Sequence, residues 1–269
     1  MMAVYVMTHK KINLNVPNYY KKMLVGAYRD TSDTDEYIRD DRFDNISRKN
    51  ECYCELTGLY WLWKNCDDDI IGLVHYRRFF YKRWKKINEN EVLDKKTIEY
   101  TLKKYDIIVP VKSYYTESLE DQYNNNHYAS DLKRTRKIIS EYYPEYINAF
   151  EKIMKKNTCH AFNMFIMRKE LVNEYCKWLF DILFKLEEQI DISSYDKYQR
   201  RIYGFLSERL FNVWIEKNNY KKKEYPVFNN EEKEVHTSKI YYTIRYIQSF
   251  LKSKIRFGVG KNKNEKINN

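Results

Sequence analysis

The stretch that decides the fold reads Ile70-Ile71-Gly72-Leu73-Val74-His75-Tyr76-Arg77-Arg78. Its first five residues are apolar without alternation, which is typical of a strand covered on both faces of a sheet. In open α/β sheets ligands bind beyond the carboxyl ends of the strands, so His75, Arg77 and Arg78 are expected at the functional rim. A guanidinium group pairs with phosphate oxygens in a fork and keeps its charge, which indicates an anion site. An ordinary salt-bridged strand end is the alternative interpretation.

Outside this stretch, buried strands and helical periodicity alternate along the chain. Strands are predicted at residues 3–7, 107–109 and 162–167, and helices at 47–65, 91–105, 130–140, 144–155, 169–189 and 196–217. The alternation predicts an α/β domain over residues 1–228, with a Rossmann-type, mostly parallel sheet flanked by helices and a helical C-terminal part. The segments 11–49 and 111–130 are predicted to be irregular, the second as part of a binding surface.

Charge is unevenly distributed along the chain. The 269 residues carry a net charge of +11, and residues 237–269 hold six lysines and two arginines against one glutamate, which is +7 of that total. The body is only modestly basic, which disfavours nucleic-acid binding. Residues 229–269 are predicted to form a basic amphipathic tail. Its apolar residues from Ile240 to Leu251 recur at helical spacing, so contact with an anionic membrane and packing onto the domain are both open.

The five cysteines are an odd number without zinc-ligand spacing, and no apolar run reaches membrane-spanning length. Reduced thiols in a cytoplasmic protein, or in one on the inner face of the membrane, are therefore expected.

The acidic run Asp67-Asp68-Asp69 precedes its strand and faces the opposite rim, so it is interpreted as a solvated turn.

Two further segments offer candidates for nucleotide contact. Thr8, His9 and Lys10 end the first strand, which in doubly wound sheets often lies beside a nucleotide. Asp44 and Asn45 precede the helix at 47–65 and are expected to contact ribose or base, with helix capping as the alternative. A single histidine is more often structural, which keeps a packing role open for His9.

Acidic side chains late in the chain are candidates for the general base that a hydroxyl nucleophile needs. Asp191 and Asp196 flank the junction between two predicted helices. Glu208 lies inside an amphipathic helix beside Arg209, and a structural ion pair between the two is the stronger alternative.

The segment 111–130 is rich in tyrosine and asparagine. Tyr123 and His127 within it are expected on the acceptor side of a binding site. His160 precedes a predicted strand and is interpreted as a packing residue.

Several blocks together resemble a bacterial capsular and exopolysaccharide glycosyltransferase family, catalogued as domain of unknown function 4422. They are Asp44-Asn45-Ile46-Ser47, Cys54-Glu55-Leu56-Thr57-Gly58-Leu59-Tyr60-Trp61, Gly72-Leu73 with His75-Tyr76-Arg77-Arg78, Asn163-Met164-Phe165-Ile166-Met167, Tyr175-Cys176 with Trp178-Leu179-Phe180, and Glu208-Arg209-Leu210 with Asn212-Val213-Trp214. The resemblance covers residues 3–228. It implies a GT-A-like fold and a nucleotide-sugar donor, and it adds Asn163 to the expected donor contacts.

The resemblance also bears on cofactors. Ordinary GT-A enzymes end a central strand with an Asp-x-Asp motif that holds a metal against the diphosphate, whereas here His75-Tyr76-Arg77-Arg78 stands at the comparable strand end. No metal ligands are therefore expected and no cofactor is expected to be required, with manganese or magnesium as the alternative.

The predicted function is transfer of a hexose from a nucleotide sugar, UDP-linked by expectation, to a surface polysaccharide or a lipid-linked oligosaccharide. A non-catalytic scaffold of polysaccharide assembly is the alternative, and a nucleic-acid-binding protein is less favoured.

Overall fold

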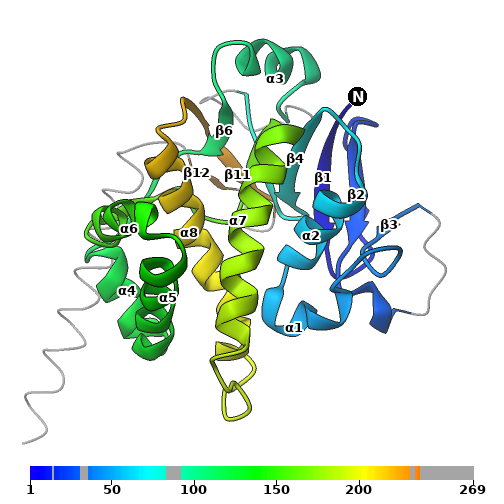
Figure 1. Cartoon of the computed structure of the whole chain (residues 1–269). Helices are drawn as coiled ribbons and strands as arrows, with labels where there is room; N and C mark the ends of the chain where they lie inside the picture. The colour runs from blue at the N-terminus through cyan, green and yellow to red at the C-terminus, as the bar shows by residue number, and fades with distance from the viewer. Residues whose placement is uncertain (14, 31–35, 83–91, 231–233, 237–269) are drawn as a thin grey trace, which may run out of the picture.

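The computed structural model describes residues 1–236 except 14, 31–35, 83–91 and 231–233. A mixed sheet in the order β10-β6-β9-β4-β1-β2-β3 forms its centre (Figure 1). Its strands are β1 (Met2–Thr8), β2 (Tyr20–Leu24), β3 (Ile38–Arg39), β4 (Ile70–His75), β6 (Ile107–Pro110), β9 (Phe165–Arg168) and β10 (Lys222–Tyr225). Only β9 runs antiparallel to its neighbours along this path. The predicted mostly parallel α/β sheet flanked by helices is confirmed.

Short strands and helices complete the domain. The additional strands are β5 (Arg78–Phe80), β7 (Ser113–Tyr114), β8 (Thr158–Cys159), β11 (Val227–Asn229) and β12 (Glu234–His236). The α-helices are α1 (Asn50–Tyr53), α2 (Leu56–Asn65), α3 (Lys95–Leu102), α4 (Leu119–Asn126), α5 (Ala129–Tyr142), α6 (Ile147–Met154), α7 (Lys169–Glu187) and α8 (Ile202–Asn218). The 3-10 helices are η1 (Ala27–Arg29), η2 (Ser47–Lys49), η3 (Pro144–Tyr146) and η4 (Gln199–Arg201).

The continuous apolar runs are explained by two cores, one on each face of the sheet. Along β1, Tyr5 and Met7 join the larger core, which is closed by α2, α7 and α8. Val4 and Val6 join the smaller core, to which α3 contributes Ile98. Because side chains alternate between faces and both faces are covered, every residue of β1 is buried. Figure 1 shows α7 crossing in front of the sheet.

Several sequence predictions fail where local pattern misleads. Residues 11–49 are not irregular throughout, because β2 and β3 extend the sheet there; the half-buried Lys21 and Lys22 of β2 disguise it as polar. The segment 111–130 contains α4, which Ser118 caps by accepting from the Asp121 amide. The acidic run 67–69 is not a solvated turn at its centre, since Asp68 is buried and accepts a hydrogen bond from Tyr5.

Two elements near the strand end also differ from expectation. The strand predicted from Ile70 onward folds back after His75, and β5 pairs with it antiparallel. The helix at 47–65 is broken at Cys54, which has a positive φ of 52°. The boundary predicted at residue 228 falls within β11, and the sheet continues into β12. The remaining tail, with its expected membrane contact, lies outside the described residues.

Gly72 sits where β4 passes closest to its neighbours. A Cβ built there lies 2.9 Å from a Val4 methyl and 3.0 Å from Ile166. Both neighbours are fully buried, so neither has room to move. Gly72→Ala is therefore expected to lower the free energy of unfolding by about 1–3 kcal/mol in urea denaturation.

Gly204 provides the matched control for this substitution. A Cβ at Gly204 meets its nearest neighbour, the Cys54 sulfur, at 3.4 Å, which is ordinary contact. Because alanine favours helix over glycine, Gly204→Ala in α8 is expected to be neutral or stabilising by up to about 1 kcal/mol. Equal losses in both variants would contradict the packing explanation.

Candidate functional site

The carboxyl edge of the parallel strands gathers residues from distant parts of the chain. His75 ends β4 beside the end of β1. β9 runs antiparallel to β4 and pairs Phe165 with Leu73, so the turn before β9 reaches the same edge. Glu55, just before α2, and Glu208 of α8 hydrogen-bond to that turn. In Figure 1 this is the lower end of β1, where α1 also lies.

His75 is fixed to the turn before β9. Its Nε2 lies 2.5 Å from the carbonyl oxygen of Phe162, and because a carbonyl only accepts, Nε2 carries the proton. Burial lowers the pKa of His75, and nearby Arg78 lowers it further against the opposing effect of Glu55. His75 is thus a neutral hydrogen-bond donor at pH 7, whose role in this structure is to hold the backbone of the turn.

The turn itself has an unusual backbone. Phe162 and Asn163 have φ values of 75° and 52°, in the left-handed region that side chains rarely adopt. The Asn163 amide nitrogen donates to Glu55 Oε1 at 2.7 Å and to the carbonyl of Gly204 at 3.2 Å. Asn163 is 4% exposed, and among the described residues its Oδ1 has no hydrogen-bond partner. Strained backbone and an unused buried acceptor both concentrate at ligand sites.

Glu208 completes the acidic side of this cluster. Its Oε1 accepts a hydrogen bond of 3.2 Å from the Phe162 amide, and 27% of its side chain is exposed. Burial raises the pKa of Glu208, Arg209 opposes this, and Glu55 adds to it. The Arg209 guanidinium forms a long ion pair with Glu208 at 3.9 Å, the alternative considered from the sequence, and also donates to the carbonyl of Phe205. A carboxyl group with a raised pKa and access to solvent suits a general base.

Basic side chains lie after the ends of β1 and β4. The Arg78 guanidinium lies 4.5 Å from the centre of the Phe162 ring. The ring of Tyr76 contacts the Arg77 guanidinium at 5.7 Å and Lys10 Nζ at 5.0 Å. Of these three cations Arg78 contacts the turn, and its positive charge acts on Glu208 against the rise in the pKa of that carboxyl group. Cations that stabilise an anionic leaving group, next to a base that accepts a proton, suit group transfer from a phosphate-activated donor to a hydroxyl.

The residues at the end of β1 differ in their exposure to solvent. Thr8 is buried, and its hydroxyl donates to the carbonyl of Lys10 at 2.6 Å, so its side chain shapes the turn. His9 is exposed, and its ring packs edge-on against Tyr76 at 5.4 Å between centroids. His9 and Lys10 are the members of this predicted group that remain accessible to a ligand.

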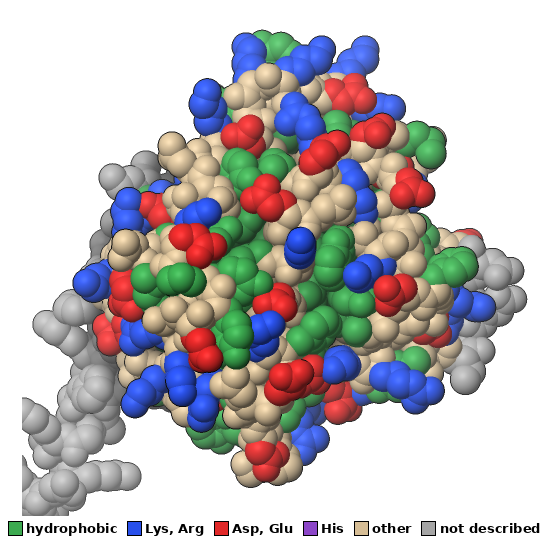
Figure 2. All heavy atoms as spheres, in the orientation of Figure 1, with side chains coloured by type: hydrophobic (Ala, Val, Ile, Leu, Met, Phe, Trp, Pro, Cys, Tyr) green, Lys and Arg blue, Asp and Glu red, His purple; other side chains and the backbone are tan. Residues whose placement is uncertain are grey.

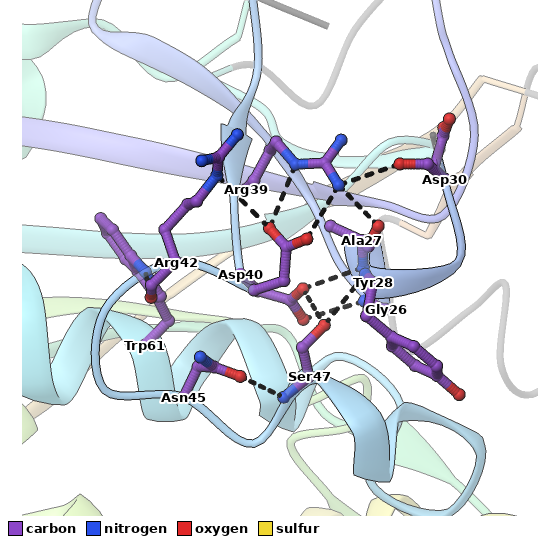
Figure 3. Close-up of polar contacts among 11 residues, drawn as sticks. Gly26, Ala27, Tyr28, Asp30, Arg39, Asp40, Arg42, Asn45, Ser47 and Trp61 are labelled. Atoms are coloured by element: carbon purple, nitrogen blue, oxygen red, sulfur yellow. Dashed lines mark hydrogen bonds and ion pairs between the residues drawn. The ribbon is translucent and has the colours of Figure 1, made fainter. Parts of the chain in front are cut away.

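Asp44 and Asn45 lie in the loop that leads to α1. Asp44 accepts a hydrogen bond from Tyr60, and the Asn45 side-chain oxygen accepts one from the Ser47 amide at 3.1 Å. Figure 3 shows Asn45 directed at Ser47, close to Asp40. Asn45 therefore stabilises a local turn before η2, and it is not the N-cap of that helix, which is Ile46.

Asp191 and Asp196 make local turns in the junction between α7 and η4. Asp191 accepts from the Ser193 amide, and Asp196 accepts from the amides of Tyr198 and Gln199. Both are exposed. Neither has a described hydrogen bond or ion pair to the cluster around Glu208, so of the three predicted bases the structure brings only Glu208 to the strand end.

Tyr123 and His127 come together in α4 and its C-terminal end, with ring centroids 4.8 Å apart. Tyr123 is fully buried, so its ring packs inside the domain, and its expected place on the acceptor side stays a prediction. His127 is half-buried and stacks on Phe205 at 4.2 Å. His160 is buried with its Nδ1 at 2.7 Å from the carbonyl of Pro110, as expected of a packing residue.

Sequence reasoning missed two components of the site. No local pattern marks Glu55 as a site residue, because an acidic residue before a helix ordinarily serves the helix N-terminus. Phe162 was placed inside a strand, and no local pattern signals its positive φ. Asp40, which is described below, lay in a segment interpreted as irregular.

Within the residues that the structure describes, no group of three or more His, Cys, Asp or Glu side chains is arranged to hold a metal ion. Arg77 and Arg78 at the end of β4 carry guanidinium groups, which bind anions, while the Nε2 proton of His75 is engaged by the carbonyl of Phe162.

The surface charge of the body is mixed on the face that carries α7. Figure 2 shows Lys and Arg side chains interspersed there with Asp and Glu, without a large area of one sign. A uniform basic surface of the kind that binds nucleic acid is not seen on this face. Of the described helices, none has both the length and the apolar character needed to cross a membrane.

Comparison with known proteins identifies the family. A family model described as a domain of unknown function, DUF4422, matches residues 3–219. The chain belongs to the DUF4422 family. The sequence resemblance to this family is therefore confirmed. No curated protein matches the chain.

This DUF4422 chain also resembles a solved structure. The apo structure of WbbM, a bifunctional glycosyltransferase, superposes with a TM-score of 0.74 at 30% sequence identity. The match covers 85% of this chain and 45% of the WbbM chain, so this chain spans less than half the length of that protein. The GT-A-like α/β fold expected for the DUF4422 chain is supported by this likeness to a glycosyltransferase.

Proposed function

We propose that this DUF4422 chain is a glycosyltransferase that moves a hexose from a nucleotide sugar, UDP-linked by preference, to a glycan or a lipid-linked oligosaccharide. The observation that carries the proposal is the turn at Phe162, which contacts the Arg78 guanidinium through its ring and Glu208 through its backbone amide. The likeness to a glycosyltransferase structure supports the same chemistry.

In the proposed reaction an acceptor hydroxyl gives its proton to the Glu208 carboxylate while its oxygen bonds to the anomeric carbon of the donor. The bond from that carbon to the phosphate oxygen breaks, and its electron pair leaves with the nucleoside diphosphate. Arg77 and Arg78 stabilise the negative charge that develops there. The buried Oδ1 of Asn163 is available to accept a hydrogen bond from a sugar hydroxyl.

A calorimetric or thermal-shift panel of UDP-, GDP- and dTDP-sugars, with and without manganese, tests the proposal. Stabilisation by at least one nucleotide sugar is expected without added metal, because binding to the native state raises the melting temperature. If no donor binds, the proposed enzymatic function is contradicted and a non-catalytic scaffold is favoured. Binding that requires manganese would contradict the proposal that the arginines stabilise the diphosphate without a metal, but it would not contradict the proposed glycosyltransferase activity.

Single replacements Arg77→Met and Arg78→Met are expected to weaken nucleotide-sugar binding by about 10- to 100-fold each, the size of a charged hydrogen bond. Methionine retains much of the apolar stem that packs on Tyr76 or Phe162. Arg134→Met is the control, because Arg134 is an exposed residue of α5. Binding unchanged in the first two variants would show that the phosphates lie elsewhere.

A further inference from the structure

Three stacked rings form an exposed surface one helical turn from Glu208. We name it the aromatic shelf and define it as His127, Tyr198 and Phe205. The His127 ring lies 4.2 Å from Phe205 with an angle of 27° and 5.8 Å from Tyr198 with an angle of 18°. Tyr198 and Phe205 are 5.1 Å apart. Tyr198 is 53% exposed, which leaves the shelf open to solvent.

The shelf is held in place by polar contacts around it. Gln199 bridges its two segments, with Oε1 at 3.0 Å from His127 Nδ1 and Nε2 donating to the carbonyl of Asn126. The Arg201 guanidinium lies 5.3 Å from the Phe205 ring. Burial lowers the pKa of His127, so its ring is neutral at pH 7. The result is a rigid, uncharged aromatic surface with amide and guanidinium donors at its rim.

The position of the shelf relates it to the reaction centre. Phe205 and Glu208 are three residues apart in α8, so their side chains lie on neighbouring positions of one helix face. Arg209 ties the two together, because it donates to the carbonyl of Phe205 and lies 3.9 Å from the Glu208 carboxylate. A ligand lying on the shelf therefore has its edge near the proposed base.

We infer that the aromatic shelf binds the terminal sugar ring of the glycan acceptor. A sugar ring has an apolar face of C–H groups and a polar edge of hydroxyls, which matches flat aromatic rings bordered by hydrogen-bonding side chains. An anionic ligand would not require the uncharged rings, and a wholly apolar one would leave the polar rim unsatisfied. This assignment rests on the proposed function and names the half of the site that receives the sugar.

Saturation-transfer NMR of the full chain with a panel of methyl hexosides, with UDP present, tests the shelf. Transfer to the ring C–H protons of at least one glycoside is expected for the wild type. Tyr198→Ser is expected to weaken the binding of that glycoside by about 3- to 10-fold and to raise the acceptor KM by the same factor, which is the size of one aromatic contact. Tyr198→Phe keeps the ring and is expected to retain wild-type binding.

Tyr142→Ser is the control, because Tyr142 is 47% exposed but lies at the end of α5. No transfer to any glycoside in the wild type, or equal binding by wild type and Tyr198→Ser, would overturn the shelf. Donor stabilisation is measured on the same variants and should not change. If no nucleotide sugar stabilises the wild type while glycosides still bind, the proposed glycosyltransferase function is contradicted and sugar binding by the aromatic shelf is supported.

Discussion

Glu208→Gln is expected to lower sugar transfer by about 10²–10⁴-fold, the usual contribution of a general base. Glutamine keeps the oxygen that accepts from the Phe162 amide, so the turn should survive. What it removes is the ability to take the acceptor proton. The measurement is kcat with saturating donor and acceptor, with nucleotide-sugar affinity as the check that the donor half of the site is intact.

The pH dependence of the wild type follows from the raised pKa of Glu208. Only the carboxylate accepts a proton, so transfer should rise with pH through a pKa above the ordinary range of a glutamate. The contribution of Glu208 to folding stability changes with pH in the opposite direction. The unfolded chain ionises this group more readily, so Glu208 makes folding less favourable as pH rises above the ordinary glutamate pKa. Glu208→Gln should therefore melt at or above the wild-type temperature at pH 8, and this advantage should vanish at low pH.

Glu216 supplies the control on the same helix. It pairs with Lys152 and Lys156, and the hydrogen bond from Lys152 is the main cause that lowers its pKa. Glu216→Gln should retain transfer and gain no stability at pH 8. Glu208 is not the base if Glu208→Gln keeps more than roughly a tenth of wild-type kcat, which lies outside the range for a lost base.

Asp40→Ala is expected to destabilise the domain by about 4 kcal/mol, since each buried donor left unpaired costs about 1 kcal/mol or more. Asp40 is fully buried. Its carboxylate accepts from the amides of Gly26 and Ala27 and from the hydroxyl of Ser47, at 2.6–3.0 Å (Figure 3). It also accepts from the hydroxyl of Thr57 at 2.6 Å. Urea denaturation with an unchanged m-value is the measurement.

Asp41→Ala is the matched control in the adjacent position. Asp41 pairs with Arg39 at 2.8 Å near the surface, and that hydrogen bond is the main cause that lowers the pKa of Asp41. Partly exposed pairs contribute up to about 1 kcal/mol, so a small loss is expected above the ordinary aspartate pKa and none well below it. If Asp40→Ala lowered the free energy of unfolding as little as Asp41→Ala does, the four donors that bind Asp40 would have found other partners.

Asp40 also links stability to the site. It joins the loops after β2 and β3 to Ser47 of η2 and Thr57 of α2. Glu55, which bonds Asn163, lies two residues before Thr57. Partial activity loss in Asp40→Ala is therefore expected through Glu55, by displacement rather than by removal of a group that touches substrate.

Local sequence determined the parts of this protein whose signal is contained in a few consecutive residues. The unbroken apolar runs of β1 and β4 identified strands buried on both faces. The rule that ligands bind at the carboxyl ends then placed Arg77 and Arg78 at the edge where the structure has them. Helices with strong periodicity, such as α7, were recognised for the same reason. Lysines on β2 concealed that strand, because its pairing rather than its composition defines it.

Tertiary structure alone decided which of the candidate acids lies at the turn that Arg78 contacts. Glu208 is selected over Asp191 and Asp196 because α8 carries it to the turn before β9. Glu55 meets Asn163 across 108 residues of chain, a contact that no local pattern encodes. The positive φ of Phe162 likewise depends on its contacts with His75 and Glu208. Sequence determines such features only through the complete fold, because their free energy comes from partners far apart in the chain.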